Sequence, residues 1–293
     1  MELRHLRYFI AIAERSSFRA SADALHVSQP TLSQQMKDLE EELGCKLFER
    51  AGRGVRLTQA GLLFVDYARR AMNVLDEGQA AVDEIDEMLR GRLRIASVQT
   101  AGAYLLPQAV ARFHRDFPAV EVRVSELSAG EIETGLHDGA LDLAVSFEPV
   151  GKRTLSCEVL FDEQFVLVVS KRHDFAGRKR IRLSELFETS LCLLTREYCT
   201  RHMIDDAFGK AGASPRIGLE MTSVEGCLRV ADAGGPPTIL PRLAVSGRKL
   251  DSIRIERPII KRNVCLLQRR SQDVSRAGET FAGVIREAAR SLA

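Results

Sequence analysis

Apolar residues recur at helical spacing through the first 43 residues and predict three short helices. The break between the second and the third, His26 to Ser28, is too short to be a loop of its own. Ser28 can cap the third helix, and Pro30 fits its first turn, where a missing N–H costs nothing. The pattern therefore predicts two helices that meet at a sharp turn. The apolar positions are Leu3, Leu6, Phe9, Ile10 and Ala13, then Phe18, Ala22 and Leu25, then Leu32, Met36, Leu39 and Leu43.

The third helix carries a polar face near its N-terminal end. Amide and hydroxyl side chains suit the edges of bases, and a free helix N-terminus suits a phosphate, so this face is a candidate for contact with DNA. An ordinary two-helix corner with a polar face is the alternative. The candidate residues are Ser28, Gln29, Pro30, Thr31, Ser33, Gln34 and Lys37.

Two strand-like pieces follow Gly44, a residue type that favours a helix end. Lys46–Phe48 and Val55–Leu57 flank a glycine-rich turn and predict a hairpin wing. A basic wing tip can reach the DNA backbone or the minor groove, although a solvated basic turn is the alternative. The basic residues here are Arg50, Arg53 and Arg56.

A long helix is predicted after the wing. Thr58 can cap it, and from Phe64 small and apolar residues alternate in steps of four and three, a heptad seam typical of paired helices. A rod of about 48 Å, at ~1.5 Å per residue, cannot bury this seam against a small head, so we expect it to pair with a second copy. The seam positions are Phe64, Ala68, Ala71, Leu75, Gly78, Val82, Ile85 and Leu89.

From Gly91 short apolar runs alternate with helical segments, which predicts an α/β region with a mostly parallel sheet and helices on both faces. A break in composition near Phe161-Asp162 indicates two lobes. The expected strands cover residues 93–97, 120–126, 141–147, 165–170, 191–194, 217–221 and 264–268. The expected helices cover residues 105–117, 131–137, 183–187, 200–210, 224–233 and 274–292.

Ligands of open α/β sheets bind beyond the carboxyl ends of the strands, where helix N-termini supply N–H groups. The residues expected there are rich in hydroxyl groups, and as a convergent set they favour a small anion. The alternative is that Thr100, Ser128 and Thr200 are plain helix caps. The candidate effector-binding residues are Gln99, Thr100, Ser128, Ala129, Ser146, Phe147, Cys199, Thr200 and, as a charge partner, Arg201.

Composition narrows the class of protein. With 45% hydrophobic and 28% charged residues among 293, the chain fits a globular protein of two or three compact units. It shows no export signal and no run of about 18 apolar residues, so we expect a cytoplasmic location and no membrane partner. A net charge of +2 makes any DNA affinity depend on where the basic groups lie.

No motif for catalysis or metal binding is present. The chain lacks GxSxG, HExxH and GxxxxGKS/T, so an enzyme is not expected. The six cysteines form no CxxC pair, and the six histidines have no ligand spacing, so no metal or cofactor is expected.

The head resembles the DNA-binding end of LysR-type transcriptional regulators. That family's Ser-Phe start, Leu-x-Val-Ser-Gln-Pro turn and Leu-Glu-x-x-Leu-Gly-x-x-Leu-Phe-x-Arg exit are matched by Ser17–Phe18, Leu25–Pro30 and Leu39–Arg50. The resemblance implies a winged helix-turn-helix domain over residues 1–58, a linker and dimerisation helix over 59–90, and an effector-binding domain of the periplasmic-binding-protein type over 91–293. Its two Rossmann-like lobes would comprise residues 91–161 with 268–293, and residues 162–267.

The resemblance also implies a function and partners. The expected function is a regulator of nearby genes that senses a small anionic metabolite of unknown identity between its lobes, against Thr100, Ser128 or Ala129, and Thr200. The implied partners are double-stranded promoter DNA, further copies of the chain in a dimer and homotetramer, and RNA polymerase. The head and linker look most like the cyanate-operon type of regulator. One departure from the family is Gly234-Gly235-Pro236-Pro237, because two prolines remove backbone donors where the family has a Gly-Leu-Gly turn.

Two alternatives share part of this pattern. The peroxide-sensing members of the family carry a reactive cysteine at the position of Cys199, but their partner position is Phe208 here, so a single-thiol response would have to serve. A plain solute-binding protein would explain residues 91–293 but not the head.

Overall fold

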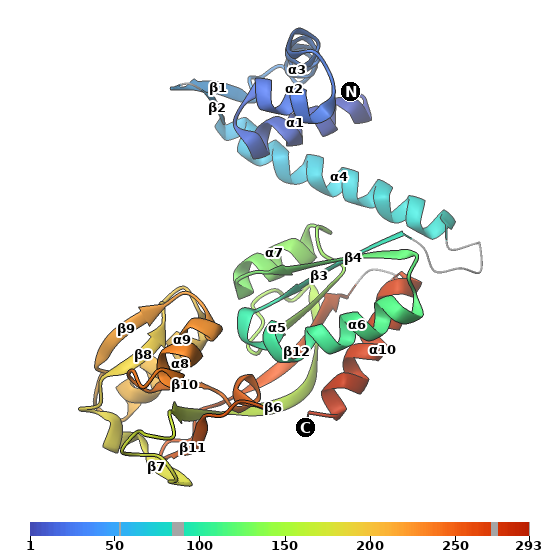
Figure 1. The fold of residues 1–293 in the computed structure, drawn as a ribbon. Coiled ribbons are helices and arrows are strands. Elements are labelled where there is room, and N and C mark those ends of the chain that lie inside the picture. The colour runs from blue at the N-terminus through green and yellow to red at the C-terminus, as the bar shows by residue number, and fades with distance from the viewer. Residues whose placement is uncertain (53, 84–90, 271–274, 293) are drawn as a thin grey trace. The chain divides into compact units, whose positions relative to one another are not determined.

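The computed structural model describes residues 1–52, 54–83, 91–270 and 275–292 (Figure 1). The chain divides into two compact units, residues 1–85 with 138–140 and residues 86–137 with 141–293. The first unit holds the helical head with its two-stranded wing and the long helix, and the second holds the larger sheet and the two-stranded sheet of β8 (Leu191–Leu194) and β9 (Ile217–Met221).

The head is a winged helix-turn-helix, as the sequence predicts. Its helices are α1 (Leu3–Arg15), α2 (Phe18–Leu25) and α3 (Gln29–Leu43). Leu32 and Leu39 of α3 are fully buried in a core shared with Phe9 of α1. The turn between α2 and α3 is made by His26, whose φ of 55° ends α2, and by Ser28, whose hydroxyl accepts a hydrogen bond from the Thr31 N–H at 3.2 Å.

The wing is an antiparallel hairpin of β1 (Phe48–Ala51) and β2 (Gly54–Leu57). It begins two residues later than predicted. The Lys46 and Leu47 carbonyls are taken by Thr58, whose hydroxyl and N–H donate to them at 2.6 and 3.0 Å. These two residues therefore bond to the start of the next helix instead of joining the ladder.

A buried carboxylate joins α3 to the wing. Glu40 accepts hydrogen bonds from the N–H groups of Leu47 at 2.8 Å and Phe48 at 3.3 Å, and it pairs with the Lys46 ammonium at 2.6 Å. These charge-assisted bonds satisfy the backbone at the point where the chain enters β1. The end of the recognition helix and the base of the wing are consequently held as one piece.

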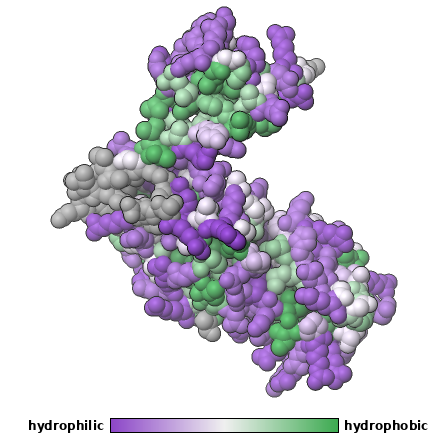
Figure 2. Space-filling view, turned by 180° about the vertical axis from the view of Figure 1, so that it is seen from behind, coloured by the Kyte–Doolittle hydropathy of each residue, from purple (hydrophilic) through white to green (hydrophobic). Residues whose placement is uncertain are grey.

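The long helix α4 (Gln59–Asp83) buries part of the predicted seam within the head. Ala68 is 1% exposed and Phe64 packs beside it in the head core, so the expectation that the whole seam faces a second copy is wrong for this first segment. Val82 has no described side chain, and Ile85 and Leu89 lie outside the described residues. Figure 2 shows apolar residues gathered on the surface of this unit, and those of α4 with large exposure are Leu62, Leu63, Tyr67, Val74 and Leu75.

In the second unit, a sheet runs in the order β4-β3-β5-β12-β6-β11-β7, with β10 also paired to β6. The first three strands, β3 (Gly91–Ser97), β4 (Val120–Glu126) and β5 (Leu143–Phe147), are parallel. The expected mostly parallel sheet is nevertheless wrong. The longest strands, β6 (Leu155–Val169) and β12 (Lys261–Arg269), pair antiparallel with each other, and β12 pairs antiparallel with β5.

The remaining elements surround these strands. Those of the first lobe are α5 (Gln99–Tyr104), α6 (Leu106–Asp116), α7 (Ala129–His137) and α10 (Arg276–Arg290). Those of the second lobe are β7 (Arg180–Arg182), η1 (Leu183–Leu186), β8 (Leu191–Leu194), α8 (Cys199–Lys210), β9 (Ile217–Met221), α9 (Val224–Asp232), β10 (Thr238–Pro241), η2 (Arg242–Val245) and β11 (Asp251–Glu256).

Separate apolar cores define the two lobes. The core of the first lobe includes Phe161 and resumes at Val264, whereas the cores of the second lobe run from Phe165 to Ile260. The break in composition at Phe161-Asp162 thus lies inside one continuous strand, β6. Residues 264–267, which the sequence analysis placed in the second lobe, pack in the core of the first.

The unusual Gly234 to Pro237 turn closes helix α9. Gly234 has a φ of 84°, and the N–H groups of Gly234 and Gly235 donate to the carbonyls of Ala231 and Val230. Pro237 lacks an N–H, but its carbonyl accepts from the Cys192 N–H of β8 at 2.9 Å. The turn therefore needs no donor from either proline. Among the described helices, none is long and apolar enough to cross a membrane.

Candidate DNA-binding and effector-binding sites

The predicted reading face of α3 is exposed. Gln29 and Lys37 are exposed, as are Ser28, Pro30, Thr31 and Gln34, while Ser33 is half-buried. The Gln34 amide donates to Asp38 at 2.7 Å and Lys37 pairs with Glu41 at 3.4 Å, so these two side chains are held along the helix. Gln29 is in the first turn of α3 and makes the start of this exposed face.

The two described arginines of the wing differ in whether they form an ion pair. Arg56 donates to Glu49 across the hairpin at 2.8 Å, so its charge is largely neutralised. Arg50 is exposed and makes no ion pair with any described residue. Arg53 lies outside the described residues. Arg50 is therefore the arginine of β1 and β2 that keeps its donors for a phosphate.

A pocket of about 310 Å³ gathers most of the predicted effector-binding residues. Its wall joins the N-terminal ends of α5, α7 and α8, and three glutamates and Tyr198 complete its lining together with Val98 and Leu127. The predicted residues that line it are Gln99, Thr100, Ser128, Ala129, Cys199 and Thr200.

The hydroxyls of Thr100 and Thr200 converge on a residue that the sequence analysis missed. Arg262, on β12, donates to the Thr100 hydroxyl at 2.7 Å and to the Thr200 hydroxyl at 3.1 Å. Its guanidinium also lies 3.3 Å from the centre of the Phe147 ring, a cation–π contact. One buried cation thus links the first lobe to the second.

Glu163 neutralises this cation. It lies on β6, the other strand that crosses between the lobes, and accepts from the Arg262 Nε at 2.6 Å. Both side chains are 1% exposed. The Tyr104 hydroxyl donates to Glu163 at 2.7 Å, and burial together with this carboxylate raises the pKa of Tyr104 far above its usual range. The tyrosine is therefore a permanent donor, and both oxygens of Glu163 are used.

Cys199 stands at the edge of this cluster. Its sulfur is 4.0 Å from the Arg262 Nη1, and the residue is half-buried in the pocket wall. Burial raises the pKa of the Cys199 thiol, although Arg262 and Thr200 oppose the shift. Arg262, whose charge is paired with Glu163, lowers the pKa of the thiol less than burial raises it.

Three predicted effector residues do not line the pocket. Ser146 is buried inside β5, and Phe147 is buried and packs against Arg262. Arg201 is 1% exposed and donates to Asp205, Glu220 and the Leu194 carbonyl, so its donors are used inside the second lobe. The charge partner near Thr200 is Arg262 instead.

The Ser128 end of the pocket already holds a carboxylate. Glu131 accepts from the Ser128 N–H at 2.8 Å and from its hydroxyl at 2.7 Å. These bonds lower the pKa of Glu131, which keeps the side chain ionised. The N-terminus of α7 is therefore capped by the chain's own anion.

Comparison with known proteins identifies the family. Residues 3–62 match the model of the bacterial regulatory helix-turn-helix protein, lysR family, and residues 86–290 match the LysR substrate binding domain. This chain belongs to the LysR family. It is accordingly a DNA-binding transcriptional regulator with a two-lobed effector-binding domain.

Several proteins similar to this LysR-family regulator are named as activators of hydrogen peroxide-inducible genes. The hydrogen peroxide-inducible genes activator of Dickeya chrysanthemi is 36% identical, with 98% of this chain and 95% of that protein covered. Full-length OxyR C199D from Pseudomonas aeruginosa is similar in structure, with a TM-score of 0.73, 26% identity and coverage of 99% and 95%. CbnR complexed with its target DNA aligns over all of both chains, with a TM-score of 0.72 and 27% identity.

The sequence of this LysR-family protein holds a weak signal for Arg262 and Glu163, the two residues that the sequence analysis missed. Arg262 and Glu163 are charged residues that each lie two positions before an apolar run that predicts a strand, Arg262 before residues 264–268 and Glu163 before 165–170. Two such charges predict a buried ion pair only when the two strands are known to be neighbours. The sheet register shows that β6 and β12 are neighbours and that Arg262 lies opposite Glu163.

The reading face of α3 generates a first prediction. Replacing Gln29 with Ala should cost about 1–3 kcal/mol of preference for the regulator's own upstream DNA over random DNA, the range for one good base contact. Replacing Arg50 should weaken binding to both DNAs alike, because a phosphate contact carries no sequence information. Gel-shift titrations at fixed salt measure both, and a Gln29→Ala protein with full preference would remove Gln29 from the reading face.

The buried pair generates a second prediction. Arg262→Met should destabilise the effector-binding domain by about 3–5 kcal/mol, because it leaves the Glu163 carboxylate buried without its partner. Adding Glu163→Leu to Arg262→Met should recover most of that loss. The exposed pair of Arg286 and Glu158 is the control, and Arg286→Met should cost under about 1 kcal/mol. Calorimetry of the full chain tests this; equal losses in the single and double variants would contradict it.

Proposed function

We propose that this LysR-family regulator responds to a small polar effector that binds between its lobes at Thr100, Ser128 and Thr200. The observation that carries the proposal is the guanidinium of Arg262, which donates to two hydroxyls that line the pocket, one from each lobe. An effector that bonds to either hydroxyl competes with Arg262 for that oxygen. Binding would therefore change the link between the lobes.

The proposed effector carries at most a single negative charge. The bonds of Glu131 to Ser128 support this, since the N-terminus of α7 holds a carboxylate there. Glu126, Glu131 and Glu197 line the pocket, whereas no lysine or arginine does among the described residues. A ligand with several negative charges would be repelled. The resemblance to the cyanate-operon type, confined to the head and linker, leaves the choice of effector open.

The proposed output is a change in DNA geometry. A ligand in contact with both lobes biases their closure by its differential affinity for the open and closed states. The lobes are joined to the DNA-binding domain through the linker helix, so closure in an oligomer would alter the spacing of the heads. Such a regulator would act on promoter DNA in the cytoplasm, with RNA polymerase as the partner that reads the altered DNA.

A second candidate function is oxidant sensing through Cys199. The relatives named for hydrogen peroxide favour it, and so does the position of the thiol, which lines the pocket 4.0 Å from Arg262. Two observations weigh against it. Burial raises the pKa of the thiol, and Phe208, nine residues further on, is fully buried in place of a second cysteine. Oxidation would have to stop at a single sulfenic acid.

A third prediction separates the two candidates. A reporter fused to the regulator's own upstream region is followed in cells given either small monocarboxylates or hydrogen peroxide. Thr100→Val with Thr200→Val should abolish the response to the monocarboxylate and leave promoter occupancy intact, because valine keeps the volume and loses the hydroxyl. Cys199→Ser is the matched control and should respond normally. The reverse pattern, with a peroxide response lost in Cys199→Ser alone, would establish the thiol and reject the effector pocket.

We further propose that the regulator dimerises through α4 and assembles into a tetramer through its effector-binding domains. The exposed apolar residues of α4 support the dimer. Leu63, Tyr67 and Val74 are 67%, 57% and 61% exposed at spacings of four and seven residues, close to one face of the helix, with Leu75 beside them. A stripe of this kind is costly to leave in water, and a second copy of the helix would cover it.

A fourth prediction tests this assembly. Leu75→Glu should dissociate the dimer, since burying an unpaired charge costs several kcal/mol. Val159→Glu, at an equally exposed apolar residue of the effector-binding domain, is the control and should leave the α4 dimer intact. Light scattering measures the mass of both proteins. An unchanged mass for Leu75→Glu would place the dimer contact elsewhere.

A further inference from the structure

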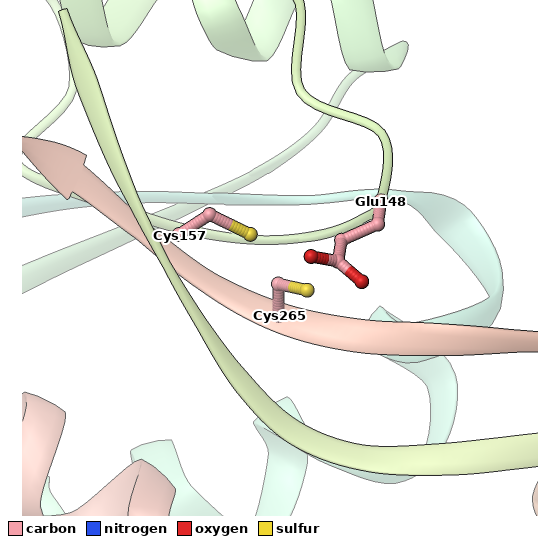
Figure 3. Close-up of side chains that lie close together, drawn as sticks. All are labelled: Glu148, Cys157 and Cys265. Carbon is pink, nitrogen blue, oxygen red and sulfur yellow. The ribbon is translucent and has the colours of Figure 1, made fainter. Parts of the chain in front are cut away.

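A group of metal-ligating side chains lies outside the effector pocket. Cys157 on β6, Cys265 on β12 and Glu148 just after β5 point toward one another (Figure 3). Their sulfur and carboxylate oxygen atoms all lie within 4.8 Å of one another. Neither the proposed effector response nor the thiol of Cys199 uses these three residues.

The strand register makes these cysteines a poor disulfide pair. Cys157 lies opposite Leu267 and Cys265 lies opposite Val159, so the two cysteines are diagonal neighbours on one face of the sheet. Diagonal Cβ atoms in a ladder are typically about 6–8 Å apart, whereas a disulfide needs about 3.8 Å. A metal ion between the sulfurs removes this mismatch, because it adds two bonds of about 2.3 Å.

The donor set suits one class of ion. Two thiolates select a thiophilic ion, and the hard carboxylate oxygen favours Zn²⁺ over Cu⁺. Glu148 is held in place by Asn263, whose amide donates to the Glu148 Oε2 at 2.7 Å. Such a hydrogen bond to a ligating carboxylate is a usual companion of protein metal sites.

Burial and charge suit the same ion. Cys265 is fully buried, Cys157 is half-buried and Glu148 is exposed, so the site is anchored in the sheet and open at one side. Glu148 and Cys157 line a cavity of about 680 Å³ together with Lys152, Arg153 and Lys261. Two thiolates, one carboxylate and one Zn²⁺ leave a net charge of −1, which these basic residues balance.

We propose that Cys157, Cys265 and Glu148 form a Zn²⁺ site, with water as the fourth ligand, that joins β5 to the two strands crossing between the lobes. Binding releases the two thiol protons, one of which Cys265 now donates to the Asn263 carbonyl at 3.7 Å. The open fourth position faces the cavity. The site would make β6 and β12, the two strands that cross between the lobes, sensitive to the supply of zinc.

Cobalt absorption of the full chain tests the proposal. The reduced, metal-free protein titrated with Co²⁺ should develop a thiolate-to-cobalt charge-transfer band that saturates at one ion per chain and disappears when Zn²⁺ is added. Cys157→Ser and Glu148→Gln should each weaken Co²⁺ binding at least about tenfold. Asn263→Ala should weaken it by about 10–100-fold through the loss of its bond to Glu148.

Matched variants keep the result interpretable. Cys45→Ser removes an exposed thiol of the other unit, and Cys199→Ser removes the thiol of the effector pocket, so both should bind Co²⁺ as the unaltered chain does. Circular dichroism of metal-free Cys157→Ser confirms that it folds. A missing band in the unaltered chain, a band lost only in Cys45→Ser, tight binding of Cu⁺ alone, or a Cys157–Cys265 disulfide in peptide maps would each overturn the proposal.

Discussion

The ion pair of Arg262 and Glu163 is the interaction on which the effector-binding domain depends. Each residue comes from one of the two strands that cross between the lobes, and each side chain is 1% exposed. Burying two charges is costly unless every donor and acceptor finds a partner. The partners are Tyr104, Thr100 and Thr200. Thr100 belongs to the first lobe and Thr200 to the second. Because this buried pair needs those hydrogen bonds, it constrains the N-terminal ends of α5 and α8, which carry Thr100 and Thr200.

The head uses the same device at its own joint. Glu40 places a carboxylate against the backbone that enters the wing, much as Glu163 places one beside the crossing strands. In both cases a buried charge sits where two elements must keep a fixed relation, while the surrounding apolar cores set the elements themselves. Hydrophobic burial is non-directional, so it cannot specify a joint in the way that hydrogen bonds to a charge can.

Periodicity made much of this fold predictable. The helical positions of Phe9, Leu32 and Leu39 repeat in sequence and are buried as expected. The site was harder to predict, because the ion pair behind its two threonines is made by residues 163 and 262, which lie about a hundred positions apart in the chain and carry no local motif. The three short strands β7, β10 and β11 were missed since each gains its pairing from β6 or from a strand beside it. The seam of α4 shows a further limit of prediction, because a heptad pattern does not say whether a position packs against the head or against a second copy of the chain.

The hydrogen bonds of Ser128 to the Glu131 carboxylate bear on how sensitive the regulator is to its effector. If the effector binds Ser128 as proposed, Glu131 is a tethered competitor, present at a high effective concentration that does not depend on the cell's metabolism. Any carboxylate effector that takes Ser128 must displace it, so the apparent dissociation constant is the intrinsic one divided by the fraction of chains in which Glu131 has moved away. In the effector response proposed above, residue 131 would thus set the threshold, while Thr100 and Thr200 would set which molecule is recognised. Natural variation at that single position would retune the dose at which transcription changes without altering chemical selectivity.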